Sequence, residues 1–135
     1  MQAMPNIKPK KILVVEDDVA MRDIVVHKLS SAGFTVVEAS DGQMGIDQFT
    51  HERPNLVLLD LMLPEVDGFK VLETIRDNTD KEVAETPVIV LSNLWSNQDI
   101  LKTQALRADA YLVKAYFTTE EILAKVNEIL EQKSK

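Results

Sequence analysis

Five short apolar runs constrain the fold of this chain more than any other feature. They cover residues 11–15, 34–39, 55–59, 87–91 and 110–113. Three of the runs contain almost no alternating polar residues, which is typical of strands buried on both faces. Parallel sheets bury both faces in this way, so the runs predict a five-stranded parallel sheet.

Apolar residues recur at helical spacing in the segments that separate and follow these runs. The helical segments are residues 19–32, 43–51, 67–76, 97–107 and 119–132. We expect the first segment to present one apolar face formed by Met21, Ile24, Val25, Leu29 and Ala32. Met44 in the second segment and Leu101 in the fourth are expected on apolar faces as well. Strands that alternate with helices predict an α/β fold with five helices distributed over both faces of the sheet.

Local sequence patterns mark several ends of these elements. Gly33 follows the first helical segment as a C-terminal stop, and Asp18 is expected to cap its N-terminus. Thr118 and Glu121 are spaced as a capping box for the last helix. Residues 77–86 are polar and charged, and we expect them to form an irregular loop.

Length and composition indicate one domain. The 135 residues, 45% of them apolar, suit a single core. We expect residues 1–9 to form a flexible leader and residues 10–133 the folded domain. The chain has no cysteine, which excludes disulfides and thiolate metal sites, and its formal net charge of −7 disfavours direct binding to nucleic acid. No apolar run is long enough to span a bilayer, so we expect no membrane partner. The absence of cysteine fits a reducing compartment, and we expect a cytoplasmic protein. Because of the negative charge, we expect no direct nucleic-acid partner.

Chemically distinctive side chains follow four of the five runs, where the strands are expected to end. They are Glu16 and Asp17, Asp60, Ser92 and Lys114, after the first, third, fourth and fifth runs. In open parallel sheets, ligands bind at the carboxyl ends of the strands, where the strand order reverses. Placing the second strand at an edge gives the order 2-1-3-4-5. Asp17 and Asp60 then follow neighbouring strands.

Carboxylates that converge on one edge of a sheet require a compensating charge. Two unit charges 5 Å apart repel by about 3 kcal/mol at an effective dielectric constant of 20, so one carboxyl is protonated or a cation neutralises the group. Carboxylate and backbone oxygens suit Mg²⁺, and the pattern offers no histidine or thiol that would favour zinc. A carboxylate can also accept a phosphoryl group. The pattern therefore indicates an aspartyl phosphate at Asp60, which is held rigidly yet exposed to a phosphodonor.

The motifs ILVVEDD, LLDLMLPEVDGF, VIVLSN and YLVK, in this order and spacing, resemble the receiver domain of two-component response regulators. The resemblance covers roughly residues 10–132 and implies a flavodoxin-like three-layer sandwich. It implies a stand-alone switch in which Asp60 accepts phosphate from a histidine kinase or a phosphotransfer protein. The chain would catalyse only its own phosphorylation and slow dephosphorylation.

The resemblance also implies a role for each residue of the site. The ligands of Mg²⁺, for which Mn²⁺ can substitute, would be Glu16 through water, Asp17, Asp60 and the backbone carbonyl of Met62. Ser92 and Lys114 would contact the phosphoryl oxygens. Tyr111 resembles the switch aromatic that moves inward when the hydroxyl of Ser92 is drawn to the phosphate. The output surface, formed by residues 97–107, 110–113 and 119–132, would control a protein partner, and we expect a monomer, with dimerisation on phosphorylation left open.

The sequence departs from the family pattern in three places. One is Asn93, which follows Ser92 where the family commonly has a small residue. Ala115 replaces the usual proline after Lys114, and we expect a trans peptide there because a cis bond before alanine costs about 3 kcal/mol. Arg107 stands where a glycine often turns the chain into the fifth strand. Met62 and Leu94 flank the site with apolar side chains that orient an attacking water poorly, which predicts slow self-dephosphorylation.

Two other functions remain open at this point. A degenerate receiver would bind partners without phosphate, although the complete set of acids, hydroxyl and lysine argues against it. A phosphatase with an aspartate nucleophile, of the haloacid dehalogenase type, would need a second aspartate two residues after Asp60. Met62 occupies that position, which argues against turnover. No glycine-rich nucleotide motif occurs in the sequence.

Overall fold

The computed structural model describes residues 8–94 and 96–133, so most of the expected leader lies outside the described residues. The strands are β1 (Lys11–Val15), β2 (Thr35–Ala39), β3 (Leu56–Leu59), β4 (Val88–Ser92) and β5 (Ala110–Val113). The α-helices are α1 (Val19–Ser31), α2 (Gly42–Glu52), α3 (Gly68–Arg76), α4 (Lys81–Ala84), α5 (Asn97–Ala105) and α6 (Thr119–Lys133). A 3₁₀ turn, η1 (Lys114–Tyr116), connects β5 to the last loop.

The five strands form one parallel sheet in the order β2-β1-β3-β4-β5, which confirms the predicted topology. The register pairs Val15 with Leu59, and Leu59 with Val90. Since all strands run in the same direction, the residues that follow them gather along one edge of the sheet. This edge carries the side chains that the sequence analysis selected.

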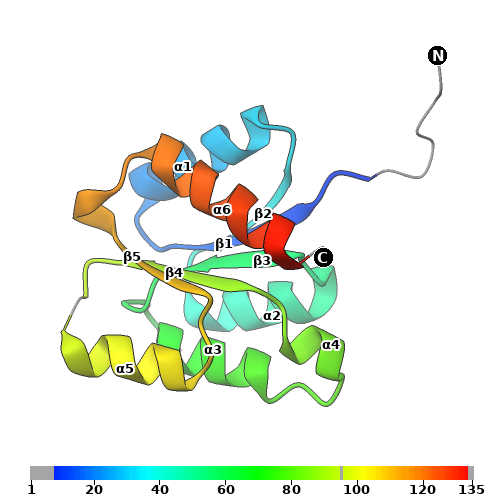
Figure 1. Ribbon diagram of the computed structural model, residues 1–135. Helices are drawn as coiled ribbons and strands as arrows, with labels where there is room; N and C mark the ends of the chain where they lie inside the picture. The colour runs from blue at the N-terminus through cyan, green and yellow to red at the C-terminus, as the bar shows by residue number, and fades with distance from the viewer. Residues whose placement is uncertain (1–7, 95, 134–135) are drawn as a thin grey trace.

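Successive residues of the central strands point to opposite faces of the sheet. Ile12 and Val14 pack in one hydrophobic cluster with residues of α1 and α6, whereas Leu13 and Val15 pack in a second cluster with residues of α2 and α3. Figure 1 shows α1 and α6 on one side of the sheet and α2, α3, α4 and α5 on the other. Both faces are covered, which explains why the central strands lack polar alternation.

The predicted helix ends are confirmed. The Asp18 carboxylate accepts the N–H of Met21 at 2.9 Å and caps α1, and Gly33 beyond the other end of α1 has φ = +100°. Thr118 Oγ1 accepts the N–H of Glu121 at 3.1 Å, while the Glu121 carboxylate accepts the N–H of Thr118 at 2.9 Å. This reciprocal pair is the capping box at the start of α6.

Residues 77–86 are not wholly irregular, because they contain the single-turn helix α4. Asp80 caps this turn by accepting the N–H of Glu82 at 3.0 Å. A four-residue helix has too few positions to show an apolar period, so the sequence pattern did not reveal it. The described helices include none that is both long and apolar enough to cross a membrane.

Four residues that were expected on apolar helix faces are exposed instead. One of them, Ala32, is the C-terminal cap of α1 and follows its last helical residue. Ile24 is 54% exposed and lies one residue, about 100° of rotation, from buried Val25. Leu101 is 63% exposed and lies two residues from Thr103, the buried residue of α5.

Met44 is exposed because its neighbour Gly45 takes the inward position of α2. A Cβ atom on Gly45 would lie 3.0 Å from a Val15 methyl carbon, so the helix approaches β1 closely at this glycine.

Candidate functional site

The two acids expected at the centre of the site lie side by side at the carboxyl ends of β1 and β3. Because Val15 pairs with Leu59, the next residues along each strand, Glu16 and Asp60, are neighbours. The N–H of Asp60 donates to the carbonyl of Val15 at 3.1 Å, which extends the sheet to the acceptor residue. The backbone of Asp60 is therefore fixed by the sheet.

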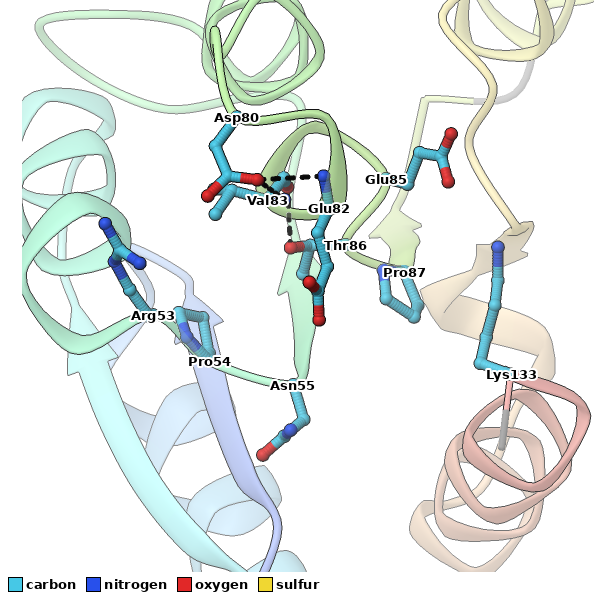
Figure 2. Close-up of a pocket in the computed structure, with 10 residues that line it drawn as sticks. All are labelled: Arg53, Pro54, Asn55, Asp80, Glu82, Val83, Glu85, Thr86, Pro87 and Lys133. Atoms are coloured by element: carbon cyan, nitrogen blue, oxygen red, sulfur yellow. Dashed lines mark hydrogen bonds between the residues drawn. The ribbon is translucent and has the colours of Figure 1, made fainter. Parts of the chain in front are cut away.

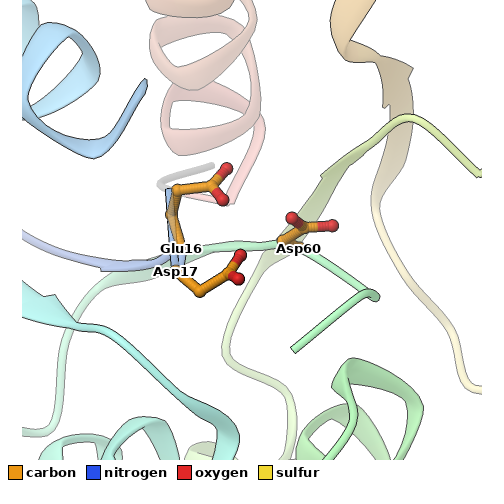
Figure 3. Close-up of side chains that lie close together, drawn as sticks. All are labelled: Glu16, Asp17 and Asp60. Atoms are coloured by element: carbon orange, nitrogen blue, oxygen red, sulfur yellow. The ribbon is translucent and has the colours of Figure 1, made fainter. Parts of the chain in front are cut away.

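Three carboxylates converge at this edge, as the sequence analysis expected. One oxygen each from Glu16, Asp17 and Asp60 lies within 4.8 Å of the others. Figure 3 shows the three side chains at the adjacent ends of β1 and β3, with Asp17 pointing toward Asp60. Glu16 is buried, whereas Asp17 is exposed. The donor set consists of hard oxygen atoms, two of them buried, and it fits Mg²⁺ or Mn²⁺.

Lys114 reaches from the end of β5 to both buried acids. Its Nζ donates to Asp60 Oδ2 at 2.8 Å and forms an ion pair with the Glu16 carboxylate. Burial works against the charged ammonium, but its hydrogen bonds to Asp60 and Glu16 outweigh burial and raise the pKa of Lys114. Burial raises the pKa of Glu16, because lost solvation outweighs the hydrogen bond from Lys114.

The expectation that Asp60 is open to solvent is corrected by the structure. Asp60 is only 5% exposed, since its Oδ2 is covered by Lys114 and its Oδ1 accepts the N–H of Met62 at 3.1 Å. The cavity beside Glu16 and Asp60 measures about 10 Å³, which is room for about one water. The N–H of Met62 therefore lies at the site. The carbonyl of Met62 remains a predicted ligand of Mg²⁺.

Ser92 and Tyr111 are linked through the backbone of one residue, Leu94. The buried hydroxyl of Ser92 accepts the N–H of Leu94 at 3.3 Å, and the hydroxyl of Tyr111 donates to the carbonyl of Leu94. Burial, assisted by the negative charges of Asp99 and Asp60, raises the pKa of Tyr111 to about 12. Sequence reasoning selected both side chains but missed this link, because a backbone acceptor leaves no residue-type pattern.

In the described residues, the hydroxyl of Ser92 contacts Leu94 and not Asp60. Val90 pairs with Leu59, so the next residue of β4, Leu91, is level with Asp60. Ser92 lies one residue further along β4. Its predicted contact with a phosphoryl oxygen would therefore require the hydroxyl to turn away from the N–H of Leu94.

Two of the predicted departures from the family pattern can be compared with the structure. The described part of the chain contains no cis peptide, so the peptide before Ala115 is trans as expected, and Ala115 lies in the 3₁₀ turn η1. Arg107 adopts φ = +60°, the left-handed conformation that favours glycine. The turn into β5 therefore keeps the backbone conformation of a glycine turn.

A pocket among the described residues lies away from the acidic site. It has a volume of about 450 Å³ and is lined by charged residues of both signs, among them Arg53, Asp80, Glu85 and Lys133. Figure 2 shows Asn55 and Pro87, which precede β3 and β4, among the residues that line this pocket. It therefore lies at the amino-terminal edge of the sheet, and the predicted residues lie at the carboxyl edge.

Comparison with known proteins places these features in a family. Residues 12–127 match the family described as the response regulator receiver domain. Among solved structures, the chain is similar to a CheY-like receiver domain protein from Methanospirillum hungatei, with a TM-score of 0.83, 26% identity and coverage of 94% of this chain and 98% of that one. The receiver domain of Francisella response regulator 1452 gives a TM-score of 0.81 with 29% identity, covering 93% and 99% of the two chains.

Curated relatives are about twice as long as this chain. A probable transcriptional regulator, ycf27, from Cyanophora paradoxa is 38% identical over 127 residues, which cover 94% of this chain and 51% of the relative. The DNA-binding dual master transcriptional regulator RpaA from a Synechocystis strain is 40% identical over 122 residues, which cover 90% and 49%. The chain thus spans about half the length of these relatives, and they do not support the expectation of a stand-alone receiver.

The expectation that nucleic acid is not a direct partner is contradicted by these relatives. Their names describe transcriptional regulators and, for the Synechocystis protein, DNA binding. The net charge of this chain gave the wrong expectation, because the chain matches only about half of each relative. The family match, the sheet order and the acidic site agree with one another: the chain belongs to the response regulator receiver domain family of two-component signalling.

Proposed function

We propose that this receiver is a switch that accepts a phosphoryl group on Asp60 with the help of Mg²⁺. One observation carries the proposal: oxygens of Glu16, Asp17 and Asp60 converge within 4.8 Å, with the ammonium of Lys114 2.8 Å from Asp60. Three acids beside one lysine leave a negative site, which favours a divalent cation. The phosphodonor is the phosphohistidine of a histidine kinase or a phosphotransfer protein.

In the transfer step, a carboxylate oxygen of Asp60 forms a bond to phosphorus and the phosphorus–nitrogen bond of the donor breaks, leaving the electron pair on the imidazole. The N–H of Met62 orients the carboxylate, and Lys114 offsets negative charge on the phosphoryl oxygens. Bound Mg²⁺ supplies further charge neutralisation at those oxygens. Since Asp60 is nearly covered, the long side chain of Lys114 has to swing from the carboxylate to the incoming phosphoryl group.

The new phosphoryl oxygens are strong hydrogen-bond acceptors, and Ser92 is the nearby buried hydroxyl that follows the adjacent strand. When Ser92 turns to the phosphoryl group, it releases the N–H of Leu94. Because Tyr111 bonds the carbonyl of Leu94, the loop and the aromatic ring move together. The surface formed by α5, β5 and α6 then changes its shape and its affinity for a protein partner.

The names of the relatives favour transcriptional control as the output of a protein that contains this receiver. Phosphorylation-independent binding and phosphatase turnover are the two competing functions. The intact acidic site disfavours the first, and Met62 in place of a second aspartate disfavours the second.

One experiment separates the three functions. The protein is incubated with Mg²⁺ and acetyl phosphate, and both its intact mass and the released inorganic phosphate are followed. The switch predicts a persistent gain of one phosphoryl group that the Asp60→Asn variant lacks. Rapid release of phosphate over many turnovers would instead show a phosphatase, and an unchanged mass without such release would show a degenerate receiver.

A further inference from the structure

Helix α5 is held mainly at its C-terminal half. Thr103 is the one buried residue between Asn97 and Ala105. The ammonium of Lys102 lies 4.2 Å from the centroid of the Phe69 ring on α3, a cation–π contact on the same half. Leu101, in the middle of the helix, is 63% exposed. A helix with so little buried surface depends on what holds its ends.

The C-terminal end of α5 is held by Arg76, the last residue of α3. The side chain of Arg76 is only 6% exposed. Its guanidinium donates to the carbonyl of Leu106 and to the carbonyl of Arg107, both at 2.9 Å, just beyond the last turn of α5. It also donates to the carbonyls of Ala84 and Thr86, at 2.8 and 2.7 Å. One planar group thus joins α3, the segment before β4 and the end of α5.

Asp109 extends this anchor to the start of β5. Its Oδ1 accepts the N–H of Val88 at 2.9 Å and lies 3.4 Å from the Arg76 guanidinium, while its Oδ2 pairs with Lys133 at 3.2 Å. Asp109 directly precedes β5, and Tyr111 is the second residue of that strand. The Arg76–Asp109 pair therefore fixes the starting point of the strand that carries Tyr111.

The N-terminal end of α5 is connected to different groups. Leu94, which precedes the helix, bonds Ser92 and Tyr111, and both belong to the proposed switch. The N-terminal end is thus joined to groups that respond to the phosphoryl group, whereas the C-terminal end is joined to the anchor at the opposite edge of the sheet.

We propose that Arg76 makes the C-terminal end of α5 a fixed pivot, so that phosphorylation of Asp60 swings the N-terminal end of the helix, from Ser96 to Leu101. This inference rests on the proposed function, because it describes how the same switch reaches the output surface. Residues Leu106 to Ala108 stay in place. The surface offered to a partner then changes chiefly around the exposed side chain of Leu101.

Amide hydrogen exchange with and without beryllofluoride, a phosphoryl mimic, in Mg²⁺ tests the pivot. In the unchanged protein, exchange at Ile100 and Leu101 should change by roughly tenfold, and at Leu106, Arg107 and Ala108 by less than about twofold. In Arg76→Lys, which keeps the charge but lacks the planar set of donors, the last three amides should exchange roughly tenfold faster and should respond to beryllofluoride. Arg107→Lys is the matched control, because Arg107 contributes its carbonyl, and it should behave like the unchanged protein.

Equal responses at both ends of α5 in the unchanged protein would overturn the pivot, as would normal exchange at Leu106 to Ala108 in Arg76→Lys. Arg76→Met, a neutral replacement of similar length, provides a second variant and should show the same loss of the anchored end. Phosphoryl uptake from acetyl phosphate, measured by intact mass on the same variants without beryllofluoride, separates the two proposals. Normal uptake with a uniform exchange response overturns the pivot alone, whereas absent uptake overturns the proposed function and the pivot with it.

Discussion

At the scale of single residues, the acceptor carboxylate is held at both of its oxygens. The N–H of Met62 contacts Oδ1 of Asp60, and the ammonium of Lys114 contacts Oδ2. The first contact comes from the backbone and the second from a flexible side chain. Asp60 therefore keeps one fixed hydrogen bond while Lys114 is free to follow the phosphoryl group, which makes the carboxylate rigid without blocking the reaction.

Met62 should control the lifetime of the phosphoryl group. Its side chain is 57% exposed and lies two residues beyond Asp60, where it offers an attacking water no hydrogen bond. In Met62→Asn the amide can orient a water, and we expect the half-life of the phosphorylated protein to fall by roughly tenfold. The decay of intact phosphoprotein mass measures it. Met44→Asn on α2 is the control, and an unchanged half-life in Met62→Asn would contradict the role.

Tyr111 should give the stability a dependence on alkaline pH. Its pKa is about 12 in the folded protein, against 10.0 for an ordinary tyrosine, so the folded state binds more protons between these values. The contribution is fully present below pH 10 and is lost as the pH rises toward 12. Urea unfolding at several pH values should show a steeper loss of stability in this window for the unchanged protein than for Tyr111→Phe. Identical slopes would show that the Tyr111 pKa is not raised.

At the scale of helices and strands, the sequence predicted the strands better than the helix faces. Strands buried on both faces, such as Leu56–Leu59, appear in the sequence as unbroken apolar runs. A helix buries only a stripe, and one residue of rotation separates exposed Ile24 from buried Val25. Periodicity alone cannot place the edge of that stripe. The contacts of Arg76 were missed for a different reason, since four backbone carbonyls carry no residue identity.

The start of α3 sets the position of the acceptor through a close contact. A Cβ atom on Gly68 would lie 2.2 Å from the carbonyl oxygen of Asp60, so Gly68→Ala has to push the helix away from the end of β3. We expect a loss of about 3 kcal/mol in the free energy of unfolding, measured with urea, together with slower phosphoryl uptake. Gly45→Ala is the comparison variant, because its added Cβ meets the two methyl carbons of Val15, at 3.0 and 3.2 Å, and no backbone atom, so it should destabilise the protein less than Gly68→Ala. Equal effects of the two substitutions would refute the close contact.

The β4–α5 loop should lose its response when the hydroxyl of Ser92 is removed. In Ser92→Ala the carboxylate and Lys114 are intact, so uptake of the phosphoryl group should stay within about threefold of normal. The exchange of β5 and α5 amides, however, should no longer respond to beryllofluoride. Ser40→Ala, after the edge strand β2, should leave both readouts unchanged. A normal exchange response in Ser92→Ala would disprove the coupling through Leu94.

At the scale of the whole molecule, the parallel sheet separates two edges with different roles. The carboxyl edge gathers the acids, Ser92 and Lys114, and this gathering was predictable because parallel strands end together. The amino-terminal edge holds the 450 Å³ pocket and the anchor around Asp109. The sequence did not predict that second edge, since its groups come from loops and helix ends that no strand aligns. The composition of this chain also could not indicate that its relatives are about twice as long.

The dependence of phosphoryl transfer on Mg²⁺ tests the central claim most directly. The initial rate of transfer from acetyl phosphate to Asp60, located by peptide mapping, is measured over a range of Mg²⁺ concentrations and with EDTA. We predict that EDTA abolishes transfer and that Asp17→Asn, which removes one charged oxygen from the acidic cluster, needs roughly 100-fold more Mg²⁺. Transfer that persists in EDTA, or an Asp17→Asn variant with the Mg²⁺ dependence of the unchanged protein, would contradict the account.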